Sequence, residues 1–276
     1  MNSAESLLKL ESELEPYRRI GVAFSGGVDS ATLLGAAAQI LGKDNVIAFL
    51  GVSDSLARRE KEIALQVAQD IGVRLVEIET KEFLNPQYLA NDGQRCYFCK
   101  ESLFTAIHEF NFDQFELDAL AYGENSDDSV RKDRPGQRAA GEFGVIRPLS
   151  DAGLGKSDVR ELARYLKISV AEKPASPCLA SRIKPFTQVT RLALQQVEAV
   201  EDFLIGKGFT DVRARYLGDS LLIEVPDSEQ IKLADASLQS DLKLLQTQHQ
   251  LPVIEISEKP LSSGSFSHKY LESAHV

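Results

Sequence analysis

The stretch Ile20-Gly-Val-Ala-Phe-Ser-Gly-Gly-Val-Asp-Ser30 decides the fold of this chain of 276 residues. It begins as an apolar run and ends in a glycine turn, and residues 31–41, rich in Ala and Leu, have the pattern of a helix. A buried strand, a tight turn and a helix in this order aim backbone N–H groups and the positive end of the helix dipole at an anion. The stretch therefore predicts a phosphate-binding turn.

The side chains of this turn suit a nucleotide phosphate. Gly26 and Gly27 have no Cβ and let a phosphate come close, and Ser25 and Ser30 offer hydroxyl donors. Asp29 would repel a phosphate, so we expect it to hold Mg²⁺ that the phosphate shares. The structural alternative is a Gly-Gly turn with Ser30 as the N-cap of the helix.

The motif Ser25–Ser30 is not a Walker A loop, because it contains no lysine. It resembles the PP-loop of ATP pyrophosphatases. That resemblance implies that ATP is split between its α and β phosphates, and that AMP activates an oxygen atom of a second substrate.

The composition is that of a globular protein with a net charge of −10. An acidic chain is a poor general partner for nucleic acid or an anionic membrane. No apolar stretch approaches the roughly 20 residues that span a bilayer, and the first 15 residues lack a signal-peptide core. We therefore expect a cytoplasmic protein with no membrane partner.

Apolar runs and helical patterns alternate along the first part of the chain, which predicts an α/β fold with a doubly wound parallel sheet. The expected strands are the stretch from Ile20 and residues 45–52, 74–79, 117–122 and 144–149. The expected helices cover residues 1–17, 31–41, 56–71, a segment that follows Lys100 and ends at Ile107, and 158–166. The Cys96–Cys99 motif is thus expected to lie ahead of the fourth of these helices.

Ligands bind at the carboxyl ends of parallel strands. In PP-loop proteins, backbone groups after the second strand hold adenine, a role that would fall to Val52 and Ser53. Gly123 and Glu124 follow another strand and are candidates for the nucleotide or Mg²⁺. A capped strand end and a solvated acidic turn are the structural alternatives.

The predicted domains are 1–171, a PP-loop domain, and 190–276, a small α/β domain for substrate binding and oligomerisation. The proline-rich segment 172–189 lies between them, and its prolines stiffen it and end the preceding helix. We expect it to be a linker that also belongs to the active site. Residues 262–276 are expected to be a loose tail.

The three cysteines, Cys96, Cys99 and Cys178, suggest metal or redox chemistry rather than a structural disulfide in a reducing compartment. A structural zinc site normally needs four ligands, whereas three thiolates suit a 4Fe–4S cluster with one open iron. Ordinary buried cysteines are the alternative.

Two arginines, Arg213 and Arg215, lie two residues apart on an expected strand and so face one side of it. Such a pair can bind a phosphate or a carboxylate, and a surface ion-pair role is the alternative. Ser181 and Arg182 follow Cys178 closely and are further candidates for substrate contact.

Five segments together resemble the LarE family of ATP-dependent sulfur transferases, which act in nickel-pincer cofactor synthesis for lactate racemase. They are SGGVDS at 25–30, RCYFCK at 95–100, GENSDD at 123–128, SPCLASRI at 176–183 and RARYLG at 213–218. The resemblance implies Mg-ATP-dependent adenylation of a carboxylate of pyridinium-3,5-biscarboxylic acid mononucleotide. Sulfur then replaces AMP and a thiocarboxylate forms.

The family has two branches, which differ in their sulfur source. One sacrifices the sulfur of a single cysteine, which aligns with Cys178. The other holds a 4Fe–4S cluster on three cysteines, here Cys96, Cys99 and Cys178, and ferries sulfide. The resemblance favours the cluster branch. It places Asp29 and Cys178 at the catalytic centre and Ser181, Arg182, Arg213 and Arg215 at the substrate.

The resemblance also implies partners: sulfide or another sulfur donor, other proteins of nickel-pincer synthesis, and further copies of the chain, with a hexamer as the family expectation. The alternatives are a tRNA thiolase, disfavoured by the acidic charge, and an ammonia-using ligase, which needs a glutaminase. A nucleotide-binding regulatory module is the non-enzymatic alternative.

Overall fold

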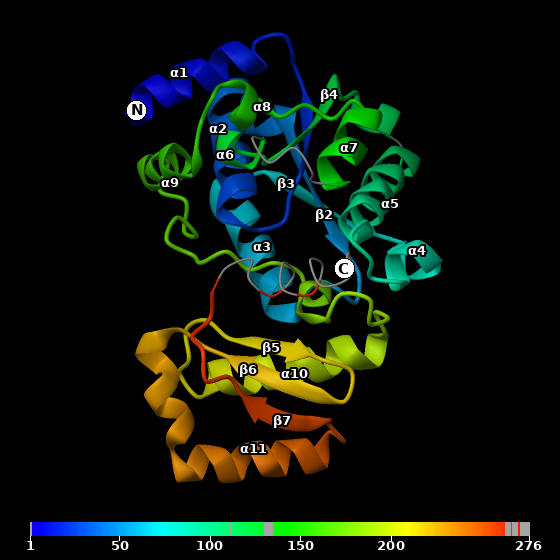
Figure 1. Cartoon of the computed structure of the whole chain (residues 1–276). Coiled ribbons are helices and arrows are strands. Elements are labelled where there is room, and N and C mark those ends of the chain that lie inside the picture. Colours follow the sequence, from blue (N-terminus) through cyan, green and yellow to red (C-terminus); the bar gives the residue numbers. More distant parts are fainter. Residues whose placement is uncertain (1, 111, 130–134, 263–265, 267–269, 271–276) are drawn as a thin grey trace. The chain divides into compact units, whose positions relative to one another are not determined.

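The computed structural model describes residues 2–110, 112–129, 135–262, 266 and 270 (Figure 1). It divides into two compact units. The first consists of Met1–Leu84 and Cys96–Ser176, and the second of Asn85–Arg95 and Pro177–Val276. The second unit thus takes in a short segment that no sequence pattern sets apart.

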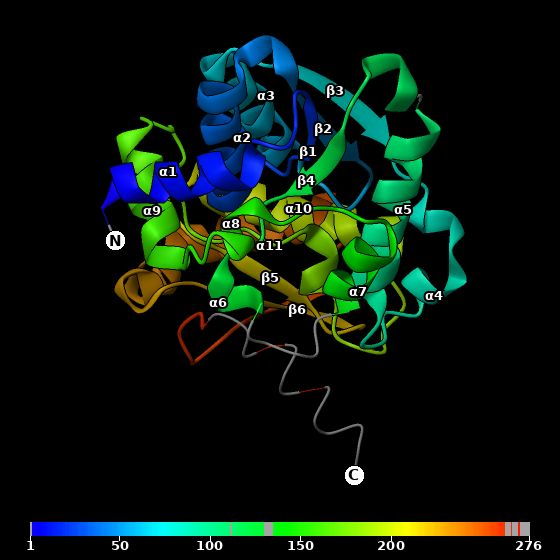
Figure 2. The same cartoon turned by 90° about the horizontal axis from the view of Figure 1, so that it is seen from above.

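The first unit is built on a four-stranded parallel sheet of order β3-β2-β1-β4. Its strands are β1 (Ile20–Ala23), β2 (Val46–Val52), β3 (Arg74–Glu79) and β4 (Ala119–Tyr122). In the register, Val22 of β1 lies opposite Ala48 of β2 and Ala121 of β4. Helices flank the sheet (Figures 1 and 2), which confirms the predicted α/β fold with a parallel sheet.

The helices of this unit lie before, between and after the strands of the sheet. They are α1 (Ser3–Leu14), α2 (Val28–Leu41), α3 (Arg58–Ile71), α5 (Arg95–Glu109), α6 (Ser126–Ser129), α7 (Pro135–Glu142), α8 (Pro148–Asp151) and α9 (Lys156–Tyr165), with 3₁₀ turns η1 (Lys43–Asn45), η2 (Glu82–Leu84) and η3 (Phe112–Phe115).

Side chains of successive strand residues enter two separate cores, as the pleat of a strand requires. Val46, Ala48 and Leu50 pack with α1, α2, α3 and α9 on one face, whereas Ile47 and Phe49 pack with α5 and α7 on the other. The sheet is therefore covered on both faces, which explains why its inner strands are apolar throughout.

Three expectations about these elements are corrected. The helix after the glycine turn begins at Val28, so Asp29 and Ser30 lie in its first turn. The Cys96–Cys99 motif is inside α5 rather than ahead of it. Residues 144–149 form no strand: Ile146 makes a single bridge to Ala121, and Pro148, which has no N–H to continue a ladder, begins α8.

The second unit contains a three-stranded sheet of order β5-β6-β7. Its elements are α4 (Pro86–Leu89), η4 (Leu179–Arg182), α10 (Arg191–Gly206), β5 (Arg213–Tyr216), β6 (Ser220–Glu224), η5 (Asp227–Ala234), α11 (Ala236–Gln248) and β7 (Val253–Ile256). Strands β5 and β6 are antiparallel and joined by a turn in which Gly218 has φ +114°. Strand β7 adds to β6 in parallel.

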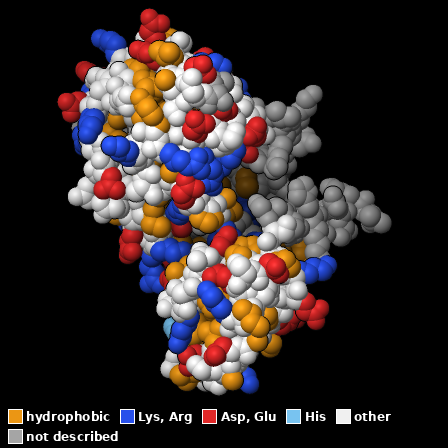
Figure 3. Space-filling view, turned by 90° about the vertical axis from the view of Figure 1, so that its left-hand side faces the viewer, with side chains coloured by type: hydrophobic (Ala, Val, Ile, Leu, Met, Phe, Trp, Pro, Cys, Tyr) orange, Lys and Arg blue, Asp and Glu red, His pale blue; other side chains and the backbone are white. Residues whose placement is uncertain are grey.

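Among the described residues, no helix combines the length and the apolar character that crossing a membrane requires. On the face drawn in Figure 3, acidic and basic side chains are interspersed with hydrophobic ones. The expected loose tail, 262–276, lies outside the described residues except for Ser262, Phe266 and Tyr270.

Candidate active site

The glycine turn lies at the carboxyl end of β1 and leads directly into α2. Gly26 has φ +72°, and a Cβ there would lie 2.8 Å from the Cβ of Ala64 in α3. Gly27 is the N-cap of α2 but has no side chain to cap it. The first N–H groups of a helix have no intrahelical acceptor, so this turn offers donors and dipole to an anion.

The two serines of the motif brace the turn. The hydroxyl of Ser30 donates to the carbonyl of Gly27 at 3.1 Å, and its oxygen accepts from the N–H of Ser25 at 3.2 Å. The Ser25 and Ser30 hydroxyl oxygens lie 3.1 Å apart. Ser30 therefore fixes the backbone of the turn instead of capping the helix.

Asp29 has one satisfied and one unsatisfied carboxylate oxygen. Its Oδ2 accepts from Nζ of Lys156 at 2.5 Å, whereas its Oδ1 is buried without a hydrogen-bond partner. A buried carboxylate oxygen without a partner is costly. Mg²⁺ prefers carboxylate oxygens as ligands. The unpaired Oδ1 next to the predicted anion site therefore fits the Mg²⁺ that Asp29 is expected to hold.

Lys156 is a further candidate site residue, which no sequence pattern predicts. It begins α9, and its backbone N–H donates to Oδ2 of Asp127 at 2.6 Å. Its side chain brings a positive charge to the first turn of α2, 127 residues away in sequence. No local pattern shows this pairing; the only signal is a lysine at the start of a helix after Gly155.

The end of β4 packs against the turn through Gly123. A Cβ at Gly123 would lie 2.6 Å from the backbone nitrogen of Ser30 and 2.8 Å from the carbonyl carbon of Asp29. Only glycine permits this approach of two backbones. Gly123 therefore lets the end of β4 pack directly against the predicted phosphate turn.

Glu124 is buried at the centre of a polar cluster. The Tyr122 hydroxyl and Nε2 of Gln137 donate to its carboxylate, the latter at 3.2 Å, and Nη1 of Arg147 lies 3.5 Å away. Burial raises the pKa of Tyr122, and the hydrogen bond to Glu124 raises it further. The ammonium of Lys100 lies over the Tyr122 ring, 4.1 Å from its centre.

The glycine turn and the end of β4 line one cavity of about 500 Å³ in the first unit. Ser25, Gly27, Asp29 and Ser30 form one part of its wall, and Gly123 and Glu124 another; Cys96, Lys100 and Gln137 of α5 and α7 line it as well. A volume of this size is typical of a small-molecule site. The cavity thus joins the predicted phosphate turn to one of the predicted thiols.

Val52 and Ser53 are not among the lining residues of this cavity. Val52 ends β2, and its carbonyl accepts from the N–H of Thr80 at 3.1 Å. The Ser53 hydroxyl accepts from the N–H of Ser55. The adenine role expected for them stays a prediction.

Cys96 and Cys99 lie one helical turn apart on α5, Cys96 exposed and Cys99 half-buried. Cys178 is exposed in the second unit, where it is the N-cap of η4. Within the described part of the chain, no three His, Cys, Asp or Glu side chains gather closely enough to hold a metal ion. The three-cysteine cluster therefore stays a prediction.

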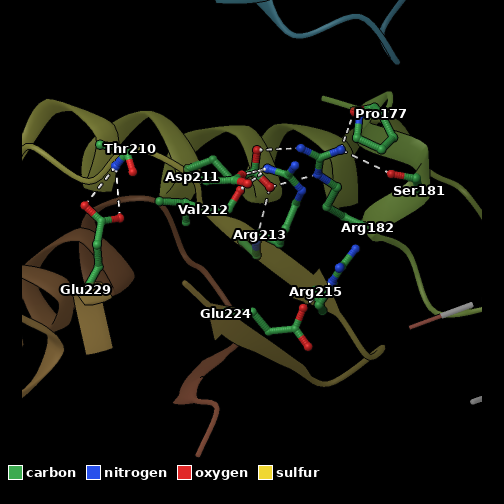
Figure 4. Close-up of polar contacts among 12 residues, drawn as sticks. Pro177, Ser181, Arg182, Thr210, Asp211, Val212, Arg213, Arg215, Glu224 and Glu229 are labelled. Atoms are coloured by element: carbon green, nitrogen blue, oxygen red, sulfur yellow. Dashed lines mark hydrogen bonds and ion pairs between the residues drawn. The ribbon is translucent and has the colours of Figure 1, made fainter. Parts of the chain in front are cut away.

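The second unit contains a buried network of charged side chains (Figure 4). Arg182 pairs with Glu201, and their side chains are 1% and 0% exposed. Arg213 pairs with Asp211. Burial lowers the pKa of Arg213, with a further decrease from the charge of Arg182, and burial raises the pKa of Asp211.

Arg213 and Arg215 differ in the hydrogen bonds that their guanidinium groups make within the protein. Arg213 donates through Nη1 to the carboxylate of Asp211 and to the carbonyl of Val212. Arg215 donates through Nε to Glu224 at 2.8 Å, and among the described residues no acceptor contacts its Nη1 or Nη2. Arg215 is therefore the better candidate for a substrate phosphate.

Comparison with known proteins gives several informative matches. The NAD synthase family model matches residues 2–96. A Synechocystis protein of unassigned function is 37% identical, with 83% of this chain and 87% of its own covered. A chain of the glutamine-hydrolysing GMP synthase from Saccharolobus solfataricus is 28% identical, with 67% of this chain and 54% of its own covered.

A third relative shows the family to which the chain belongs. The pyridinium-3,5-bisthiocarboxylic acid mononucleotide synthase of Lactiplantibacillus plantarum is 31% identical over 223 residues, which cover 79% of each chain. The matched region is far larger than the glycine motif that all PP-loop proteins share. The chain therefore belongs to the LarE family, the PP-loop enzymes that transfer sulfur at the expense of ATP.

Proposed function

We propose that this enzyme adenylates a carboxylate of pyridinium-3,5-biscarboxylic acid mononucleotide and converts it to a thiocarboxylate for nickel-pincer synthesis. A carboxylate oxygen attacks the α-phosphorus of ATP, the bond to the β-phosphate oxygen breaks, and pyrophosphate leaves. Sulfide then attacks the carbonyl carbon, the carbon–oxygen bond breaks, and AMP leaves with that oxygen. A cysteine thiolate in its place would form a thioester, whose S–Cβ bond must break to leave the thiocarboxylate and dehydroalanine. Adenylation is needed because an oxygen dianion is a poor leaving group and AMP is a good one.

The observation that carries the proposal is the cavity shared by the phosphate turn and a thiol. Asp29 and the N-terminus of α2 line it together with Cys96. An acyl adenylate formed against this turn would lie next to Cys96, which is proposed below to help hold the carrier of sulfide, and sulfide is a strong nucleophile toward a mixed anhydride.

In the first step, negative charge builds up on the departing pyrophosphate and must be stabilised. The N–H groups of the turn and the ammonium of Lys156 would stabilise part of this charge. Mg²⁺, held by the unsatisfied Oδ1 of Asp29, would supply Lewis-acid stabilisation of the phosphates. Lys156 would then move from Asp29 toward a phosphate oxygen.

For sulfur delivery we propose that the thiolates of Cys96, Cys99 and Cys178 would hold a 4Fe–4S cluster, which would supply the sulfide for the second step. Cys96 and Cys99 are spaced for adjacent ligands on α5. Arg95, which directly precedes Cys96 in the chain, donates to the carbonyl of Ala180 at 2.6 Å. Both residues belong to the second unit, so within that unit the segment that ends just before Cys96 is bonded to the segment that contains Cys178.

For the substrate we propose contacts from Ser181, Arg213 and Arg215 in the second unit. The Nη groups of Arg215 support a phosphate contact, as does the aromatic ring of Phe266, which stacks 4.7 Å from the guanidinium carbon. Arg182 was expected in the same set, but its guanidinium has other partners, described below.

The test is a coupled assay of pyrophosphate, AMP and thiocarboxylate with Mg-ATP and the pyridinium dicarboxylate under anaerobic conditions. We expect pyrophosphate release only when both substrates are present, and loss of it in Asp29→Asn. Release of ADP and phosphate, or release without the dicarboxylate, would contradict the proposal.

The sulfur source is tested on the same sample. Anaerobically purified protein should contain about four irons per chain, and its intact mass should not change after turnover. An iron-free protein that loses about 34 Da at Cys178, as conversion of cysteine to dehydroalanine requires, would establish sacrificial transfer instead.

A further inference from the structure

We infer that Arg182 is a positioning residue for Cys178: anchored by Glu201, it holds the two peptide groups that flank the cysteine and thereby fixes the direction of the thiol. The inference rests on the proposed function, because that function makes Cys178 part of sulfur delivery. It assigns to Arg182 a task other than substrate contact.

All three nitrogens of the Arg182 guanidinium have protein partners. Its Nε and Nη2 donate to Oε1 and Oε2 of Glu201 at 2.9 and 3.2 Å, in a bidentate arrangement. Its Nη1 donates to the carbonyls of Pro177 and Cys178, the latter at 3.2 Å, and lies 3.1 Å from the Ser181 hydroxyl (Figure 4). Because this side chain is only 1% exposed and each of its nitrogens already has a protein partner, it is not accessible to a substrate phosphate.

Glu201 anchors this guanidinium to the body of the unit. It lies on α10, and its Oε1 also accepts from the backbone N–H of Ala214 in β5 at 3.1 Å. The carboxylate therefore joins a helix, a strand and the arginine. Desolvation offsets most of the attraction in a buried ion pair, so this pair adds little to the stability of the fold. Its main effect is to fix the position of the Arg182 guanidinium.

The geometric consequence falls on Cys178. The carbonyl of Pro177 belongs to the peptide group before the cysteine Cα, and the carbonyl of Cys178 to the group after it. The second carbonyl also accepts from the N–H of Ser181 at 2.9 Å. With both peptide groups held, the Cα–Cβ direction of Cys178 is fixed, and a single rotatable bond remains to place its exposed sulfur.

The test compares Arg182→Lys with Glu229→Gln. Lysine keeps the charge for Glu201, but one ammonium cannot span the carboxylate and both carbonyls. Glu229 is equally a buried carboxylate of this unit, 5% exposed, but it accepts from Thr210 and Lys232 and has no contact with the Cys178 segment. Glu201→Gln serves as a second variant if Arg182→Lys does not fold.

The first readout needs no substrate. A nitroxide label on Cys178, in full-length protein carrying Cys96→Ser and Cys99→Ser, should give a broad, immobilised spectrum. Arg182→Lys should narrow it and Glu229→Gln should not. Equal spectra for wild type and both clamp variants, Arg182→Lys and Glu201→Gln, would overturn the inference, whatever the activity of the enzyme.

The second readout is thiocarboxylate formed per pyrophosphate released, in protein with all three cysteines. Arg182→Lys should lower this ratio at least about tenfold, with KM for the pyridinium substrate unchanged, whereas Glu229→Gln should leave it unchanged. A raised KM with an unchanged ratio would show that Arg182 binds substrate and would overturn the inference. Failure of wild-type enzyme to release pyrophosphate would refute the proposed function instead, and the label spectra would still decide the role of Arg182.

Discussion

Replacing Gly123 by alanine should displace the phosphate turn, because the new methyl group meets backbone atoms. Its nearest neighbours would be the nitrogen and Cα of Ser30, at 2.6 and 2.7 Å, against the 3.4 Å at which ordinary contact begins. The first turn of α2 must therefore retreat by 0.8 Å (3.4 minus 2.6 Å). Overpacking of this kind costs about 1–3 kcal/mol, which corresponds to roughly 5- to 150-fold in ATP affinity if the turn yields.

The assay is calorimetric binding of a non-hydrolysable ATP analogue, together with pyrophosphate release and thermal unfolding. Gly141→Ala is the matched control, because a Cβ there meets nothing within 4 Å and the residue lies in helix α7. That variant should bind normally and gain up to about 1 kcal/mol of helix stability. Wild-type affinity and pyrophosphate release in Gly123→Ala would refute the argument that the close approach of β4 shapes the phosphate site.

Three further predictions concern charged residues. Asp29→Asn should reduce pyrophosphate release by about 100-fold or more and weaken its dependence on Mg²⁺ concentration, with a melting temperature close to that of wild type. Lys156→Met should lower the rate by about 10- to 100-fold and leave ATP binding measurable by calorimetry. The N–H groups of Arg19 and Arg18 lower the pKa of Asp118 below its ordinary 3.8, so its stabilisation is complete above about pH 5 and is lost as the pH falls through the lowered value. In Asp118→Asn, the melting temperature should therefore fall less on acidification than it does in the wild type.

The sequence was most informative where structure follows from local pattern. Residues 46–52 and 74–79 are strands because their side chains fill cores on the two faces of the sheet, and that pattern is visible in the sequence. The strand predicted at residues 144–149 was wrong. Val145 and Ile146 have the apolar character of a strand, but only Ile146 pairs with the sheet, and Pro148 begins helix α8. Pairing between distant strands cannot be judged from one apolar dipeptide.

The candidate site was predictable in its glycine turn but not in its long-range pairs. Lys156 reaches Asp29 across 127 residues, and no pattern near either one shows it. Glu201 did carry a signal: it falls on the buried face of α10, in line with Val197 and Leu204. A carboxylate on an apolar face needs a buried cation, and Arg182 is that cation.

The central claim is that a carboxylate oxygen of the substrate becomes bonded to the α-phosphorus of ATP before sulfur arrives. Pyridinium dicarboxylate labelled with ¹⁸O in its carboxyl groups, turned over with Mg-ATP and sulfide, tests this directly by mass spectrometry of the AMP. The account predicts that the AMP contains one oxygen atom from the labelled carboxylate. Unlabelled AMP formed together with thiocarboxylate would contradict it.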